Sequence, residues 1–171
     1  MLTPSDLLGA MTQLWTPWRS AYMQEKKDKQ GCIFCDAAAG SLDRETLVVY
    51  RGASVFVLLN RYPYTSGHLM IAPYRHASRL NQLTEASADE IFRLSRRAEQ
   101  ILEHVYCPDG LNLGMNLGEA AGAGIEHHIH MHVLPRWKGD ANFMTSIGGV
   151  RIIPEALDDT YAKLRSEFAK P

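Results

Sequence analysis

The sequence predicts an α+β fold, in which a mainly antiparallel sheet of about five strands carries a long helix and a C-terminal helix. Two observations lead to this prediction. Short apolar runs follow one another closely from residue 45 to residue 73, which favours antiparallel strands. From Thr84 the apolar residues are instead spaced by three and four, which is the period of an amphipathic helix. The 171 residues are enough for one domain with a buried core.

The chain begins with an N-terminal aromatic extension, residues 1–30, ahead of a single domain, residues 31–171. The extension contains LWTPWRSAYM, whose two tryptophans and one tyrosine favour burial, followed by the charged run QEKKDKQG. We therefore expect this extension to dock on the domain or on a second subunit.

The domain divides into seven predicted elements. They are strands at 45–52, 55–60 and 68–73, a helix at 84–106, strands at 110–118 and 128–137, and a helix at 154–170. The strands are rich in β-branched residues and are bounded by glycine or proline. The long helix has Thr84 as a candidate N-cap, acids in its first turn, and the breaker PDG after it. The glycine-rich segment EAAGAG joins the last two strands.

Composition excludes several classes of protein. A net charge of -1 offers no basic surface for nucleic acid. No stretch approaches the roughly 18 apolar residues that span a membrane. The N-terminus lacks the basic region of a signal peptide, so we expect a cytoplasmic protein. Three cysteines in a reducing compartment indicate metal binding or packing rather than disulfides.

The segment GIEHHIHMHVLPRW, residues 124–137, holds four of the seven histidines. In a strand, His128, His130 and His132 share one face at intervals of about 7 Å, and the intervening apolar residues share the other. The alternative is a histidine-rich surface strand or an incidental metal-binding patch, neither of which would need this strict alternation. Clustered imidazoles suit phosphoryl chemistry, because one neutral ring can attack phosphorus while its neighbours bind the charged oxygens.

Cys32 and Cys35 form a CxxC pair. In a reducing compartment this spacing indicates half of a zinc site, a redox pair, or two packed thiols. A redox pair normally follows a strand and opens a helix, whereas this pair follows a charged linker. A zinc site would need two more ligands, and four protein ligands would make it structural.

Three segments together resemble the histidine-triad (HIT) family of nucleotidyl hydrolases and transferases, over roughly residues 30–145. They are the CxxC pair, NRYPYTSGHLMIAPYRH and HIHMHVL, in that order. The following VLPRWKGDANF is similar to the branch with diadenosine tetraphosphate phosphorylases (ATP adenylyltransferases) and dinucleoside polyphosphate hydrolases. The resemblance implies cleavage of a nucleoside polyphosphate at the α-phosphorus through a covalent nucleotidyl-histidine intermediate, with diadenosine polyphosphates as the expected substrates.

The resemblance also implies roles for individual residues. His130 is the nucleophile, His132 contacts phosphate oxygens, and His128 completes the catalytic triad. Asn60 matches the residue that binds the ribose hydroxyls, although a simple turn cap is the alternative. Asn116 matches a polar residue near the scissile phosphate.

The glycine-rich segment departs from the family's pattern. Many relatives have Gln and a Ser or Thr just before the triad, where this chain has AGAGIE. Backbone N–H groups from Gly122 to Gly124 are the expected substitutes, because glycine allows a phosphate to approach closely. A plain connection is the alternative. His68 either lines the nucleotide pocket or caps a strand.

The resemblance further implies a structural zinc ion on Cys32, Cys35, His76 and His128. It also implies at least a homodimer, paired through the long helix and the sheet edge beside it. The alternatives in function are a nucleoside phosphoramidase and a non-catalytic, zinc-stabilised nucleotide-binding module. A hexose-1-phosphate uridylyltransferase fits less well, because that branch has Gln where this chain has His132.

Overall fold

The computed structural model describes residues 31–141 and 154–171. Within these ranges five strands form one antiparallel sheet in the order β1-β2-β3-β5-β4. The strands are β1 (Val48–Arg51), β2 (Val55–Leu59), β3 (Leu69–Pro73), β4 (Gly110–Gly114) and β5 (Met131–Arg136). The predicted α+β class and antiparallel sheet are confirmed. The predicted aromatic extension, residues 1–30, lies outside the described residues.

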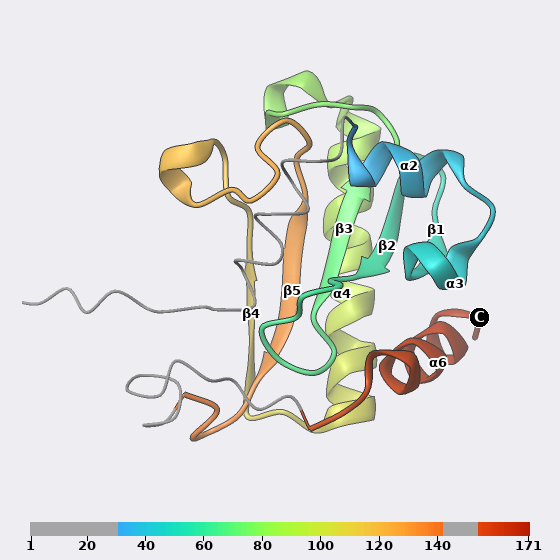
Figure 1. Cartoon of the computed structure of the whole chain (residues 1–171), viewed down its shortest axis with the longest axis vertical. Coiled ribbons are helices and arrows are strands. Elements are labelled where there is room, and N and C mark those ends of the chain that lie inside the picture. Colours follow the sequence, from blue (N-terminus) through green and yellow to red (C-terminus); the bar gives the residue numbers. More distant parts are fainter. Residues whose placement is uncertain (1–30, 142–153) are drawn as a thin grey trace, which may run out of the picture.

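Helices lie on both faces of the sheet (Figure 1). The long helix α4 (Glu85–Tyr106) runs behind the sheet, and α2 (Ile33–Ala39) lies in front of it with the short α3 (Asp43–Thr46). The C-terminal helix α6 (Leu157–Phe168) packs against α4 and β1. Two single 3-10 turns complete the described elements, η1 (Leu80–Gln82) and η2 (Glu119–Ala121).

Alternating strand side chains divide the core into two layers. Ile71 and Val133 are fully buried in the layer that includes α4. Leu58 and Met70 belong to the other layer, together with Phe34 of α2. Met70 pairs with His132 across the β3–β5 register, and paired residues point to the same face of a sheet. The third histidine of the triad therefore faces α2.

The long helix has the predicted bounds. The side chain of Thr84, its N-cap, accepts a hydrogen bond from the backbone N–H of Ser87 at 3.2 Å, and its C-cap, Cys107, is in the left-handed conformation. Buried residues recur on the face toward the sheet, as the spacing predicted. Among the described helices, none is long and apolar enough to cross a membrane.

The last strand begins at Met131, and the prediction that it covers 128–137 was wrong at its start. Continuing the β3–β5 register past Ile71 and Met131 would place Ile129 opposite Pro73. Proline has no N–H to donate to the ladder. The N–H of Ile129 instead donates to the carbonyl of Ala77 at 2.6 Å, so the chain leaves the sheet there.

Other predicted boundaries also moved. Residues 45 and 46 belong to α3 rather than to the first strand, and β4 ends at Gly114 instead of 118. The glycine-rich segment contains η2, and the C-terminal helix begins at Leu157. The short helix α2 was not predicted, and it places the CxxC pair at the start of a helix.

Candidate active site

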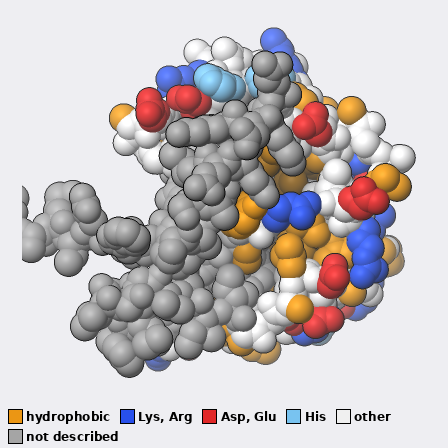
Figure 2. Space-filling model, viewed as in Figure 1, with side chains coloured by type: hydrophobic (Ala, Val, Ile, Leu, Met, Phe, Trp, Pro, Cys, Tyr) orange, Lys and Arg blue, Asp and Glu red, His pale blue; other side chains and the backbone are white. Residues whose placement is uncertain are grey.

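A cavity of about 570 Å³ lies on the side of the sheet that carries α2. On this side, hydrophobic side chains are exposed near the middle of the molecule, with charged side chains around them (Figure 2). Ligand pockets of this size are mostly apolar with a few placed polar groups. The predicted catalytic and nucleotide-binding residues that line the cavity are Asn60, Asn116, Gly122, Gly124, His130 and His132. Two of the predicted metal ligands, Cys32 and His76, also line it.

The ring of His130 is held in one tautomer. Its Nδ1 lies 2.9 Å from the carbonyl oxygen of His128, and a carbonyl can only accept a hydrogen bond. Nδ1 therefore carries the proton, and Nε2 keeps its lone pair. The ring packs against Phe34 with centroids 4.7 Å apart, and burial lowers the pKa of His130. The neutral imidazole is thus the form present at neutral pH, as a nucleophile requires.

The neighbouring ring of His132 is oriented by a histidine outside the triad. The backbone N–H of Tyr64 donates to Nδ1 of His68 at 3.2 Å, so the proton of a neutral His68 lies on Nε2. That Nε2 is 2.9 Å from Nδ1 of His132, which accepts. Nε2 of His132 consequently carries a proton. Burial, with the neighbouring His130, lowers the pKa of His132 to about 4, so the ring of His132 is neutral at pH 7.

Asn60 follows β2 and lines the cavity. Its Oδ1 accepts from the backbone N–H of Tyr62 at 3.0 Å, and its Nδ2 lies 3.4 Å from Nδ1 of His68. The side chain therefore holds the turn after β2, which was one of the two roles predicted for it. Its position on the cavity wall is compatible with the other role, ribose binding.

The glycine-rich segment is shaped by its own hydrogen bonds. Gly122 has a φ of 82°, a conformation that favours glycine. Its N–H donates to the carbonyl of Glu119 at 2.8 Å, and its carbonyl accepts from Nδ2 of Asn116 at 3.5 Å. A phosphate contact from the N–H of Gly122 would require this turn to open, whereas Gly124 lines the cavity beyond it.

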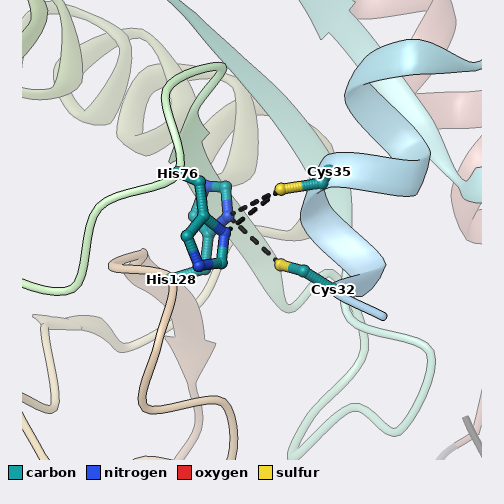
Figure 3. Close-up of side chains that lie close together, drawn as sticks. All are labelled: Cys32, Cys35, His76 and His128. Carbon is teal, nitrogen blue, oxygen red and sulfur yellow. Dashed lines mark hydrogen bonds between the residues drawn. The ribbon is translucent and has the colours of Figure 1, made fainter. Parts of the chain in front are cut away.

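Cys32, Cys35, His76 and His128 lie together beside this cavity (Figure 3). Sγ of Cys32 is 3.2 Å from Nδ1 of His128, and Sγ of Cys35 is 3.2 Å from Nδ1 of His76. All four candidate ligand atoms lie within 4.8 Å of one another. A sulfur and a nitrogen bound to one tetrahedral zinc ion are about 3.5 Å apart, so this cluster has the dimensions and the donors of a zinc site.

The elements around the cluster set its geometry. Cys32 caps α2 and Cys35 lies in its first turn, so both thiols point the same way. The fully buried His128 donates from Nε2 to the carbonyl of Pro73 at 2.9 Å, which leaves the lone pair on Nδ1, facing the thiols. The side chain of His128 therefore serves the cluster, and its carbonyl orients His130.

Phe34 was not predicted as a site residue, yet its ring packs against both His128 and His130. The helical spacing of Phe34 and Ala37, both buried, was a signal that could have found it. The role of His68 stayed open in the sequence. Its contact with His132 joins residues 64 positions apart, so no local pattern could reveal it.

Comparisons with known proteins point to one family. The HIT domain model matches residues 42–139. The AP-4-A phosphorylase of Mycobacterium tuberculosis (strain CDC 1551 / Oshkosh) is 42% identical over 168 residues, which cover 94% of this chain and 86% of that protein. The asymmetrical bis(5'-nucleosyl)-tetraphosphatase of Schizosaccharomyces pombe is 32% identical over 93 residues, 54% of this chain and 50% of that protein. A crystal structure of a zinc-bound histidine triad family protein from Mycobacterium smegmatis has a TM-score of 0.66 and 26% identity, and the match covers 81% of this chain and 94% of that chain.

Proposed function

The chain belongs to the HIT domain family, and we propose from this membership that it cleaves dinucleoside polyphosphates at the α-phosphorus with His130 as nucleophile. The observation that supports this proposal best is the hydrogen bond from Nδ1 of His130 to the carbonyl of His128. That bond leaves an unprotonated Nε2 on a residue of the cavity wall. A module that only bound nucleotides would not need a neutral ring held in this tautomer.

The reaction has two displacements at one phosphorus atom. Nε2 of His130 forms a bond to the α-phosphorus, and the bridging P–O bond breaks with its electron pair leaving on the remaining nucleoside polyphosphate. An acceptor oxygen then attacks the same phosphorus, and the P–N electron pair returns to Nε2. We propose inorganic phosphate as the preferred acceptor, because the relative at 42% identity is an AP-4-A phosphorylase. Water is the competing acceptor.

The other residues of the cavity bind and orient the substrate. The protonated Nε2 of His132, fixed by His68, donates to a phosphate oxygen as charge develops there. His128 takes part through its carbonyl, which holds the nucleophile's tautomer. We assign the ribose hydroxyls to Asn60 and the phosphate chain to Asn116 and Gly124, and also to Gly122 once its turn opens.

We propose that Cys32, Cys35, His76 and His128 hold a structural zinc ion, which supplies a cross-link rather than a reactive water because four protein ligands close its coordination. Cys32 caps α2 and Cys35 lies within it, whereas His76 follows β3 and His128 precedes β5. The cross-link would therefore fix the segment before β5, and with it the carbonyl that orients His130.

A direct assay tests the activity. Purified protein incubated with diadenosine tetraphosphate is expected to release ATP and ADP when inorganic phosphate is present, and ATP and AMP when water is the acceptor. Chromatography of the products separates these cases. Release of neither pair, with tight nucleotide binding, would favour a binding module. Cleavage of a nucleoside phosphoramidate alone would favour the phosphoramidase.

We further propose a cytoplasmic homodimer. The described cysteines are free thiols, which is typical of a reducing compartment. β4 is an edge of the sheet, and Leu113 on it has 46% of its surface exposed. An unpaired strand edge with an exposed apolar residue favours pairing with a second chain.

Asn60→Ala is expected to raise KM for dinucleotides about 10-fold, because removing a buried polar partner costs roughly 1 to 3 kcal/mol. Initial rates over a range of substrate concentrations measure the change. Asn81→Ala, in the exposed η1 turn, is the matched control and should leave KM unchanged. Sedimentation velocity should give the mass of two chains for wild type and both variants. Unaltered kinetics would contradict the ribose assignment, and a monomer at micromolar concentration would contradict the dimer.

A further inference from the structure

The metal-ligand helix α2 is too short to hold itself in place. It has seven residues, whereas isolated helices shorter than about 12 to 15 residues are marginal in water. The side chain of its N-cap, Cys32, makes no capping hydrogen bond. Its position therefore depends on the buried side chains of Phe34 and Ala37 and on the residues that contact its two ends.

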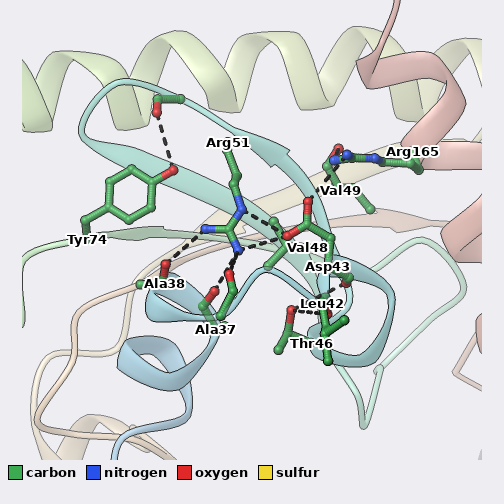
Figure 4. Close-up of polar contacts among 12 residues, drawn as sticks. Ala37, Ala38, Leu42, Asp43, Thr46, Val48, Val49, Arg51, Tyr74 and Arg165 are labelled. Carbon is green, nitrogen blue, oxygen red and sulfur yellow. Dashed lines mark hydrogen bonds and ion pairs between the residues drawn. The ribbon is translucent and has the colours of Figure 1, made fainter.

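The guanidinium group of Arg51 binds the C-terminal end of α2 (Figure 4). Arg51, the last residue of β1, donates from Nη1 to the carbonyl of Ala38 at 3.1 Å. Its Nη2 donates to the carbonyls of Ala37 and Gly40, at 2.9 and 2.6 Å. Carbonyls at the end of a helix lack an intrahelical partner, and a cation there also favours the helix dipole. Arg51 supplies both hydrogen bonds and charge.

A carboxylate shared between two arginines fixes Arg51. Its Nε donates to Oδ1 of Asp43 at 2.9 Å. The other oxygen of Asp43 pairs with Arg165 of α6 at 3.4 Å, and Arg165 also donates to the carbonyl of Val49 at 3.0 Å. Both arginines thus bind the carboxylate of Asp43 (Figure 4). Their other hydrogen bonds differ, because Arg51 donates to carbonyls of α2 and Arg165 donates to a carbonyl of β1.

The other end of α2 carries two of the four candidate metal ligands, and its middle forms part of the nucleophile's surroundings. Cys32 and Cys35 face the two histidines of the cluster. The ring of Phe34 lies 5.1 Å from that of His128 and 4.7 Å from that of His130. A displacement of α2 would therefore move two ligands at once.

We propose that Arg51 is a positioning residue for the metal centre: by holding the C-terminal end of α2, it sets how tightly the chain retains zinc. The inference rests on the proposed zinc site. Zinc binds the docked form of α2, because only that form brings the four ligands together. If the docked fraction falls, the apparent Kd for zinc rises in inverse proportion.

Arg51→Gln is expected to raise the Kd for zinc about 10-fold, within the range seen when residues behind metal ligands are changed. Competition between the full-length protein and a chromophoric zinc chelator measures this Kd. The Co²⁺-loaded variant should keep the wild-type thiolate absorption bands, because the ligand set is unchanged. Arg51→Lys keeps the charge without the forked donors, and its Kd should lie between those of wild type and Arg51→Gln.

Arg165→Gln is the matched control. It removes an arginine from the same carboxylate and a hydrogen bond to β1, but it leaves the contacts of α2 intact. Its free energy of unfolding should fall while its Kd for zinc stays at the wild-type value. If Arg165→Gln weakens zinc binding as much as Arg51→Gln does, the effect is general destabilisation and the inference is overturned.

The remaining outcomes separate the inference from the site it rests on. Wild-type protein that binds no zinc would overturn the proposed site itself. Wild-type binding with an unchanged Kd in Arg51→Gln would overturn only the role of Arg51. If Arg51→Gln does not fold, Arg51→Lys decides in the same way: a raised Kd supports the inference, and a wild-type Kd overturns it.

Discussion

His130→Ala is expected to lower the rate of dinucleotide cleavage by about four orders of magnitude or more, because the variant lacks the atom that forms the covalent bond. The ring is almost fully buried, with 6% of the residue exposed, yet it lines the cavity. Nucleotide binding should persist, since the other cavity residues are intact. Initial rates of ADP formation measure the loss, and equilibrium binding of a non-cleavable dinucleotide measures the affinity.

Two further measurements bear on the covalent step. Wild-type protein mixed with labelled substrate and quenched in alkaline denaturant should carry one labelled nucleotide, and His130→Ala should carry none. His130→Gly leaves a ring-sized space against Phe34, so added imidazole should restore part of its activity. His104→Ala, on the exposed side of α4, is the control. A near wild-type rate in His130→Ala would refute the assignment of the nucleophile.

Removal of zinc is expected to lower the melting temperature by roughly 8 to 16 °C. A ligand present at 1,000 times its Kd raises the free energy of unfolding by about 4 kcal/mol. The melting temperature of a domain of this size shifts by roughly 2 to 4 °C for each kcal/mol. Elemental analysis of protein purified without added metal should find about one zinc ion per chain, as one tetrahedral site requires. Calorimetry before and after chelation measures the shift.

Cys32→Ser should reproduce most of this loss, because serine is a poor ligand for zinc. Cys107→Ser is the matched control, since Cys107 is exposed and lies outside the cluster. It should keep both the zinc ion and the melting temperature. Metal-free wild-type protein with unchanged stability would count against the site, as would equal effects of the two substitutions.

Much of the fold could be predicted because its signals are local. The helix α4 begins and ends as expected, since Thr84 caps it and the apolar spacing runs without a break to Tyr106. The start of β5 could not be predicted from its own residues. It depends on Pro73, which faces this segment across the sheet and cannot donate a hydrogen bond.

In the candidate site, too, local features could be predicted from the sequence and long-range contacts could not. The alternation of His130 and His132 with apolar residues indicates a chemical face from the sequence alone, and both histidines do lie on the cavity wall. The contacts that fix their tautomers come from the carbonyl of His128 and from His68. The first contact involves a backbone carbonyl, which every residue has, so the sequence does not mark it. The second joins residues 64 positions apart, and such a contact produces no periodic pattern in the sequence.

His128 offers its ring to the cysteines and its carbonyl to His130. The first interaction uses the side chain and the second uses the backbone, so only the first requires a histidine at this position. Every amino acid has a carbonyl, whereas the ring is needed by the candidate metal cluster and by the contacts with Pro73 and Phe34. The first histidine of the triad is therefore exchangeable, as far as the proposed nucleophile is concerned, wherever other contacts hold this backbone in place. On the proposed mechanism, a protein engineer could replace the candidate zinc cluster by an apolar contact or a disulfide and keep the reaction, provided that the peptide unit at position 128 stays where it is.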